Sequence, residues 1–149
     1  MGLKGKVLVQ VEISFHGDIY HQLFSERPHH IPSMCKGIHG VEGQWGTVGS
    51  IITWKFSHDG KTKTAEEVIE AIDEKEKLVK FKVIGGEILE DYKSFIITCE
   101  VHNDGDNHLV TWTIEYEKVK EEIPEPLSYL EFLLDITKDM EDHHANLKP

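Results

Sequence analysis

The chain has 149 residues, of which 39% are hydrophobic and 29% are charged. These fractions are typical of a folded globular protein and exclude a disordered chain, so we expect one domain over residues 1–149 with a sizeable core. The formal net charge of −11 at pH 7 argues against nucleic acid as a partner, because the phosphate backbone would repel the protein.

The sequence lacks the features of secreted and membrane-spanning proteins. Its two cysteines, Cys35 and Cys99, are too few for a disulfide framework, and Cys99 lies in an apolar run typical of a buried thiol. The first residues carry no signal-peptide core, and no apolar run is long enough to cross a bilayer. We therefore expect a cytoplasmic protein without stable membrane insertion.

The N-terminal part of the chain predicts one strand and a short helical region. Residues 6–14 alternate between apolar and polar side chains, the pattern of a half-buried strand. A short helix is predicted from Gly17 and Asp18, because apolar residues follow them at helical spacing. Pro28 and Pro32 limit the next segment to a broken helical turn.

The middle of the chain predicts a series of strands joined by tight turns. The strands are expected over residues 38–41, 50–57, 79–83, 95–101 and 109–118. Asp59-Gly60 and residues 103–106 are typical of hairpin turns. The side chains expected to face inward from the last two strands are Phe95, Ile97, Cys99, Val101, Val110, Trp112, Ile114 and Tyr116.

Residues 64–77 are ambiguous between helix and strand. Their alanines and glutamates are good helix formers, and propensity alone favours a helix. However, the segment follows a hairpin turn, and its apolar residues alternate only loosely. From the residues alone we expect a helix, with a strand as the alternative.

A long amphipathic helix is predicted over residues 126–147. Its apolar residues recur at helical spacing, at Tyr129, Leu133, Ile136, Met140 and Leu147. Ser128 and Glu131 have the spacing of a capping box at its start. Because this helix is too apolar to stand alone and most other segments predict strands, we expect a sheet wrapped around it.

Several motifs that carry chemistry elsewhere have simpler interpretations in this chain. The glycine-rich segment, residues 42–49, lacks the lysine and the following helix of a phosphate-binding loop, so we interpret it as a tight loop at a cavity mouth. The ten histidines do not show the spacing of a metal site, and no nucleophile motif is present. We therefore expect no metal ion and no cofactor.

Large apolar side chains on one face of so many strands must pack against a single helix. Pattern alone favours a filled core, and a curved sheet that leaves an internal cavity is the alternative. The sequence does not define the oligomeric state.

Five motifs, found in the same order along the chain, resemble those of the plant major latex proteins. They are RPHHIP (27–32), VEGQWGTVGSI (41–51), FKVIGG (81–86), YKSF (92–95) and TWTIEYEK (111–118), and the ending over residues 129–144 agrees too. This family belongs to the birch-pollen-allergen superfamily of pathogenesis-related, START-like proteins. The resemblance implies an α+β helix-grip fold. In that fold a seven-stranded antiparallel sheet surrounds the C-terminal helix, two short helices lie between the first two strands, and residues 62–73 form a strand.

The resemblance also implies a large internal cavity that binds hydrophobic small molecules such as sterols, hormones or specialised metabolites, with a role in defence or stress response. The residues expected to contact such a ligand are Phe24, Ile38, Trp54, Phe56, Phe81, Phe95, Ile97, Trp112, Ile114, Tyr116, Leu130, Leu133, Leu134 and Thr137. Tyr116 and Thr137 are the candidates for its polar contacts. The loop with Gly43, Trp45, Gly46 and Gly49 is expected at the cavity entrance.

Two other functions remain open from the sequence. Relatives in this superfamily include enzymes that condense, cyclise or isomerise reactive intermediates, and the candidate acid/base residues here are Tyr116, His39 and Glu42. The third possibility is a scaffold protein that uses its acidic outer face.

Overall fold

The computed structural model describes the backbone of residues 3–147 and the side chains of residues 3–145. In this range, seven antiparallel strands form one sheet in the order β1-β7-β6-β5-β4-β3-β2. The strands are β1 (Lys4–Ile13), β2 (Ile38–Gly43), β3 (Ile51–His58), β4 (Lys61–Asp73), β5 (Leu78–Gly86), β6 (Tyr92–Asp104) and β7 (Asn107–Lys118).

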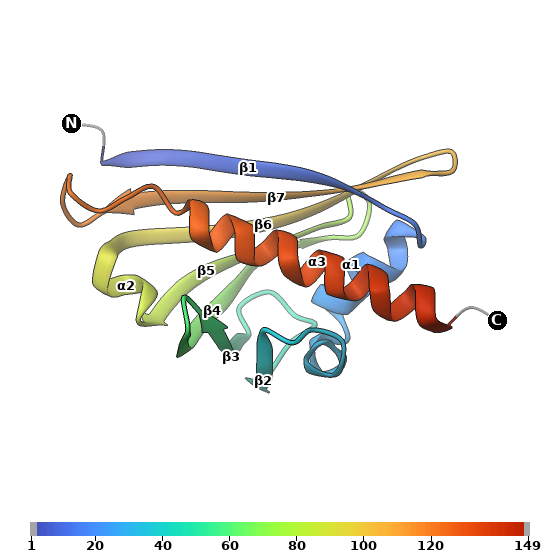
Figure 1. Ribbon diagram of the computed structural model, residues 1–149, viewed down its shortest axis with the longest axis horizontal. Helices are drawn as coiled ribbons and strands as arrows, with labels where there is room; N and C mark the ends of the chain where they lie inside the picture. Colours follow the sequence, from blue (N-terminus) through green and yellow to red (C-terminus); the bar gives the residue numbers. More distant parts are fainter. Residues whose placement is uncertain (1–2, 148–149) are drawn as a thin grey trace.

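A long helix, α3 (Leu127–Leu147), crosses one face of the curved sheet (Figure 1). Two short helices, α1 (Gly17–Ser25) and the 3₁₀ helix η1 (Pro28–Ser33), connect β1 to β2, and α2 (Ile88–Asp91) connects β5 to β6. This arrangement confirms the expected α+β helix-grip fold.

Alternation of side chains between the two faces of the sheet places the core. In β7, Val110, Trp112, Ile114 and Tyr116 are all buried, while the residues between them are more exposed. In β6, Phe95, Cys99 and Val101 are buried and Ile97 is partly buried. The expected inward faces of these two strands are confirmed.

Residues 61–73 form a strand, so the helix expected from propensity is wrong. β4 pairs with β3 on one side and with β5 on the other, with Trp54 opposite Ala65 and Phe81 opposite Ile69. Ala65, Glu67 and Ile69 are buried on its inner face. Cross-strand pairing on both sides outweighs the intrinsic helix preference of alanine and glutamate. The strand implied by the resemblance is confirmed.

The C-terminal helix begins at Leu127 and buries the expected face. Tyr129, Leu133, Ile136 and Met140 are buried, whereas the side chain of Leu147 lies outside the described residues. The predicted capping box is wrong, because Ser128 lies inside the first turn. Its hydroxyl instead lies 3.0 Å from Nε2 of His58, so that it connects the helix to β3.

A buried hydrogen-bond network joins α1, β7 and α3. Oγ1 of Thr137 donates to the carbonyl oxygen of Leu133 at 2.9 Å and therefore accepts from the Tyr20 hydroxyl at 2.7 Å. The Trp112 indole N–H lies 3.1 Å from both hydroxyl oxygens. All three side chains of this network are almost completely buried. Burial raises the pKa of Tyr20 well above its usual value, so the network stays neutral.

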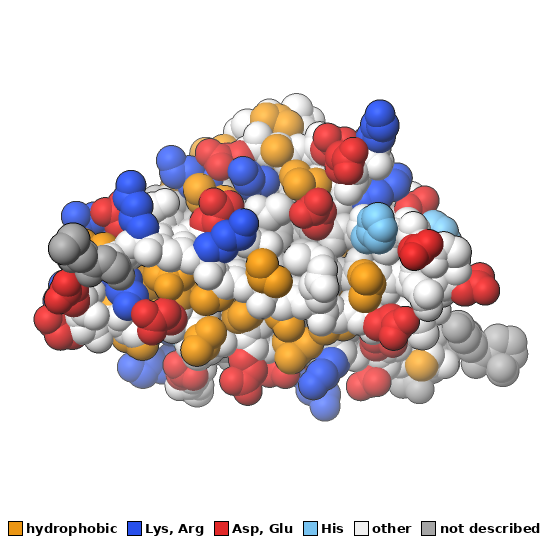
Figure 2. All heavy atoms as spheres, turned by 90° about the horizontal axis from the view of Figure 1, so that it is seen from above, with side chains coloured by type: hydrophobic (Ala, Val, Ile, Leu, Met, Phe, Trp, Pro, Cys, Tyr) orange, Lys and Arg blue, Asp and Glu red, His pale blue; other side chains and the backbone are white. Residues whose placement is uncertain are grey.

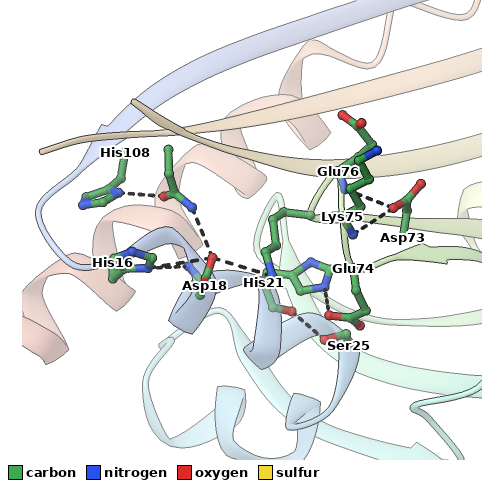
Figure 3. Close-up of polar contacts among 11 residues, drawn as sticks. His16, Asp18, His21, Ser25, Asp73, Glu74, Lys75, Glu76 and His108 are labelled. Atoms are coloured by element: carbon green, nitrogen blue, oxygen red, sulfur yellow. Dashed lines mark hydrogen bonds and ion pairs between the residues drawn. The ribbon is translucent and has the colours of Figure 1, made fainter. Parts of the chain in front are cut away.

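Polar contacts hold α1 against two turns of the sheet (Figure 3). The His16 side chain caps the helix by accepting from the backbone N–H of Asp18 at 3.1 Å. Asp18 in turn accepts from the Asn103 amide at 3.1 Å, and Nε2 of His21 lies 3.1 Å from Glu74 Oε2. These contacts fix α1 to the β6–β7 hairpin and to the β4–β5 turn.

We expect Thr137→Val to destabilise the protein by about 1–3 kcal/mol, because the buried Tyr20 hydroxyl would lose its acceptor. Urea unfolding measures this change. Thr137→Ser is the matched control, since it keeps the hydroxyl and should retain most of the stability. An unchanged urea midpoint in Thr137→Val would show that the network does not stabilise the fold.

Candidate functional site: an apolar cavity with one buried carboxyl group

A cavity lies between the concave face of the sheet and α3. Its wall is almost entirely apolar and draws side chains from nine helices and strands of the described chain. The lining residues are Phe24, Ile38, Trp54, Phe56, Ala65, Glu67, Phe81, Ile88, Phe95, Ile97, Trp112, Ile114, Tyr129, Phe132, Leu133 and Ile136. The strands contribute most of the wall, and the first three turns of α3 close it.

The cavity is small. The volume open to the centres of water-sized spheres is about 70 Å³. Since one water needs roughly 10–15 Å³ on this scale, the space suits a guest of about one substituted aromatic ring. Aromatic side chains take up the remaining interior: the rings of Trp54 and Phe81 meet edge to face at 6.5 Å, and those of Phe56 and Phe132 lie 5.3 Å apart. The interior is therefore neither completely filled nor as open as the resemblance implies.

Most residues predicted to contact a ligand are brought together on this wall. They are Phe24, Ile38, Trp54, Phe56, Phe81, Phe95, Ile97, Trp112, Ile114 and Leu133. Alternation along the strands and helical spacing predicted which side chains face inward, and the resemblance predicted the cavity that they line.

Four residues of the predicted set are not part of the wall: Tyr116, Leu130, Leu134 and Thr137. The Thr137 hydroxyl is fully engaged in the buried network with Tyr20 and Trp112. The Tyr116 ring packs edge to face on Tyr92 at 5.8 Å. Leu130 and Leu134 are only partly buried.

The other candidate acid/base residues are exposed and lie away from the wall. Nε2 of His39 is hydrogen-bonded to Oγ of Ser57, which is also on the surface side of the sheet. Glu42 forms an ion pair of 3.5 Å with Lys55, and both side chains are more than half exposed. The structure therefore does not bring His39, Glu42 and the cavity together.

The glycine-rich loop between β2 and β3 is fixed by backbone geometry and by one stacked ring. Gly43, Gly46 and Gly49 all have positive φ angles, which other residues rarely adopt. The Trp45 ring stacks on His29 of η1, with ring centroids 5.2 Å apart. The loop thus docks on η1, and its residues are not among those that line the cavity.

Glu67 is a lining residue that sequence reasoning missed. Its side chain points inward from β4, and the residue is only 4% exposed. Burial among apolar side chains raises the pKa of its carboxyl group to about 8, although a hydrogen bond from Trp54 lowers it in part. Glu67 could be recognised from the sequence only if residues 61–73 were predicted as a strand. In a strand, Glu67 lies on the inner face between Ala65 and Ile69.

A polar cluster holds the N-terminal end of α3 over the cavity. Nζ of Lys63 donates to Nδ1 of His58 at 2.8 Å and to the Tyr129 hydroxyl at 3.0 Å. Because Nδ1 accepts, the Nε2–H of a neutral His58 donates to Ser128. Burial, and then the charge of Lys63, lower the pKa of His58, which favours this neutral form.

Tyr129 separates the cavity from a polar groove on the outside. It lines both spaces, and its ring stacks on His58 with centroids 3.9 Å apart. The groove is also lined by Asp59, Lys61, Thr62, Lys63, Glu87, Glu90 and Asp91. Burial raises the pKa of Tyr129 to about 12, so its hydroxyl group stays neutral at the boundary.

Within residues 3–147 there is no group of three or more His, Cys, Asp or Glu side chains placed to hold a metal ion. No helix in the described part of the chain is both long enough and apolar enough to cross a bilayer.

Comparison with known proteins agrees with this geometry. Residues 2–146 match the sequence profile described as "Pathogenesis-related protein Bet v 1 family". The chain belongs to this family. Within it, the chain is 40% identical over 147 residues to MLP-like protein 43 of Arabidopsis thaliana, a match that covers 95% of this chain and 93% of that protein.

The family also contains longer members. MLP-like protein 28 of Arabidopsis thaliana is 40% identical over 147 residues, but the match covers 95% of this chain and only 44% of that protein. The chain therefore spans less than half of the length of this relative.

Two solved structures resemble this chain to different degrees. Major latex-like protein 151 from Panax ginseng superposes with a TM-score of 0.93 at 44% identity, and the match covers 96% of this chain and 99% of that one. Norcoclaurine synthase from Thalictrum flavum has a TM-score of 0.78 at 20% identity, over 98% of this chain and 89% of that one. The first supports family and fold, and the second shows a shared fold alone.

The buried carboxyl group of Glu67 predicts a pH-dependent difference in stability between the protein and its Glu67→Gln variant. The folded protein holds this proton up to a pKa of about 8, whereas the unfolded chain loses it near the ordinary value of 4.5. The stability that Glu67 contributes is therefore fully present below pH 4.5 and is lost as the pH rises to about 8.

Between pH 5 and pH 9, the free energy of unfolding of the unmodified protein should fall by a few kcal/mol relative to that of Glu67→Gln. Each pKa unit corresponds to about 1.4 kcal/mol. Urea unfolding of both proteins at both pH values measures the difference, and the other titrating groups cancel. A constant difference would contradict a protonated, buried Glu67.

Proposed function

We propose that this protein is a cytoplasmic plant protein that binds a small hydrophobic molecule in the cavity under α3, with a role in defence or stress response. The observation that carries the proposal is the cavity itself, a space of about 70 Å³ walled by aromatic and aliphatic side chains. Family membership supports the same function, because the resemblance implies a hydrophobic ligand.

Burial of apolar surface would supply the affinity. Transfer of apolar area from water into such a cavity is worth roughly 25 cal/mol per Å². Because the wall is already formed, little conformational freedom is lost when a guest enters. A one-ring guest fits the present volume, and a fused-ring guest such as a sterol requires the aromatic side chains or α3 to move.

An enzyme that acts on a guest in the same cavity is the alternative. The observation that favours it is Glu67, a titratable carboxyl group in contact with the space a guest would occupy. Norcoclaurine synthase, which has been crystallised with dopamine and hydroxybenzaldehyde, shares the fold, but at 20% identity it carries no substrate over to this chain.

The surface gives less support to a scaffold function. Figure 2 shows acidic and basic side chains interspersed across one face, with apolar side chains between them. On the face shown, charge of one sign does not gather into a patch that would select a partner.

Calorimetric titration with isopropylbenzene tests the binding function. We expect saturable binding at one site, accompanied by a change in the emission of Trp54 and Trp112, which line the cavity. Ala65→Leu extends a side chain into the cavity and should weaken binding by about tenfold or more, a loss of at least 1.4 kcal/mol. Ala71→Leu, on the same strand but away from the wall, is the matched control.

Equal binding by the Ala65→Leu and Ala71→Leu variants, or none by the unmodified protein, would rule out the cavity as the site. Chromatography of the recovered guest distinguishes a binder, which returns it unchanged, from an enzyme. Native mass spectrometry of protein from its source tissue would identify any retained molecule.

A further inference from the structure

Glu67 is held in a setting that leaves part of its hydrogen-bonding capacity unused. The carboxyl group belongs to the cavity wall, and the residue is only 4% exposed. Its hydrogen-bonding partner in the described structure is the indole of Trp54 on the neighbouring strand β3. The indole N–H can only donate, so it occupies an acceptor position of the carboxyl group.

No charged side chain of the wall faces Glu67 to stabilise an ionised form. Its cross-strand neighbours are Ile52 on β3 and Val83 on β5. The side chains that line the cavity from the other elements are apolar, except for the neutral Tyr129 on α3. Because burial raises the pKa of Glu67 to about 8, the group is mostly a neutral carboxylic acid at pH 7.

A neutral carboxylic acid has one O–H donor in addition to its acceptor positions. The Trp54 N–H satisfies an acceptor, and the O–H donor has no acceptor among the described side chains that line the cavity. This donor borders the cavity space, so a guest that supplies an acceptor there gains a hydrogen bond in an apolar setting.

Resting on the cavity-binding function above, we propose that Glu67 selects the guest. The cavity binds a small neutral aromatic molecule that carries one hydrogen-bond acceptor, such as an aryl ketone. The aromatic part packs between the apolar walls, and the carbonyl oxygen accepts the O–H of Glu67.

Neutrality of the guest follows from the same wall. An anion would bury its charge among apolar side chains without a cation to pair with it, which is far more costly than burying a carbonyl group. A cation would require Glu67 to ionise, and both charges would then lose their hydration in the same small space. A neutral acceptor requires neither change.

Two probes of nearly the same shape test this selection. Acetophenone carries a carbonyl oxygen where 2-phenylpropene carries a CH₂ group. The ratio of their affinities for the same protein therefore measures the contribution of the carbonyl oxygen to binding. In Glu67→Leu we expect this ratio, acetophenone over 2-phenylpropene, to fall by roughly five- to tenfold, the effect of one hydrogen bond. Glu70→Leu, at an exposed position of the same strand, should leave the ratio unchanged.

The pH dependence provides a second test on the unmodified protein. The ratio should be constant from pH 6 to pH 7 and fall between pH 7 and pH 9.5, as Glu67 loses the proton that it donates. Glu67→Gln keeps an N–H donor at the same place and should retain a preference for acetophenone that does not change with pH.

The outcomes separate this inference from the binding function. If 2-phenylpropene binds but the ratio is the same in Glu67→Leu, or does not change with pH in the unmodified protein, the role of Glu67 is wrong and the cavity function stands. If neither probe binds, both proposals fail. Should Glu67→Leu not fold, the pH series and Glu67→Gln still decide the question.

Discussion

Two polar attachments hold α3 above the sheet and determine what lies beneath it. At its N-terminal end, Ser128 and Tyr129 bond to the side chains of His58 and Lys63. Farther along, Thr137 bonds to Tyr20 and Trp112. The helix residues that line the cavity lie between these points or at the first of them, at positions 129, 132, 133 and 136. Hydrogen bonds have narrow distance limits, so the attachments resist collapse of this segment onto the sheet.

A second constraint, the pairing of β4 on both sides, explains why a carboxyl group stays in an apolar interior. Glu67 lies in the middle of a strand that is paired on both sides, so its side chain cannot turn to the surface without disturbing two neighbours. A buried carboxyl group in an apolar wall costs stability relative to an apolar residue, and such costs are typical of functional sites. In the proposed binding site, the apolar walls would supply affinity and the one polar group would orient the guest.

The sequence was most informative where one periodicity dominated. β7 and α3 were predictable because their apolar residues recur at the spacing of a strand and of a helix. β4 was not, since its alanines and glutamates favour a helix and only pairing with distant strands overrides them. Glu67 was hidden by the same ambiguity. The size of the cavity depends on how rings such as Trp54 and Phe81 pack, which no local pattern encodes.

Ligand binding depends on an apolar space that persists between the sheet and α3, and xenon can detect such a space. Xenon enters apolar cavities without needing a polar partner. A crystal structure under xenon pressure should show an atom among Trp54, Phe81 and Leu133, with the surrounding side chains unmoved. An interior without xenon, in which these three side chains contact one another, would contradict the account.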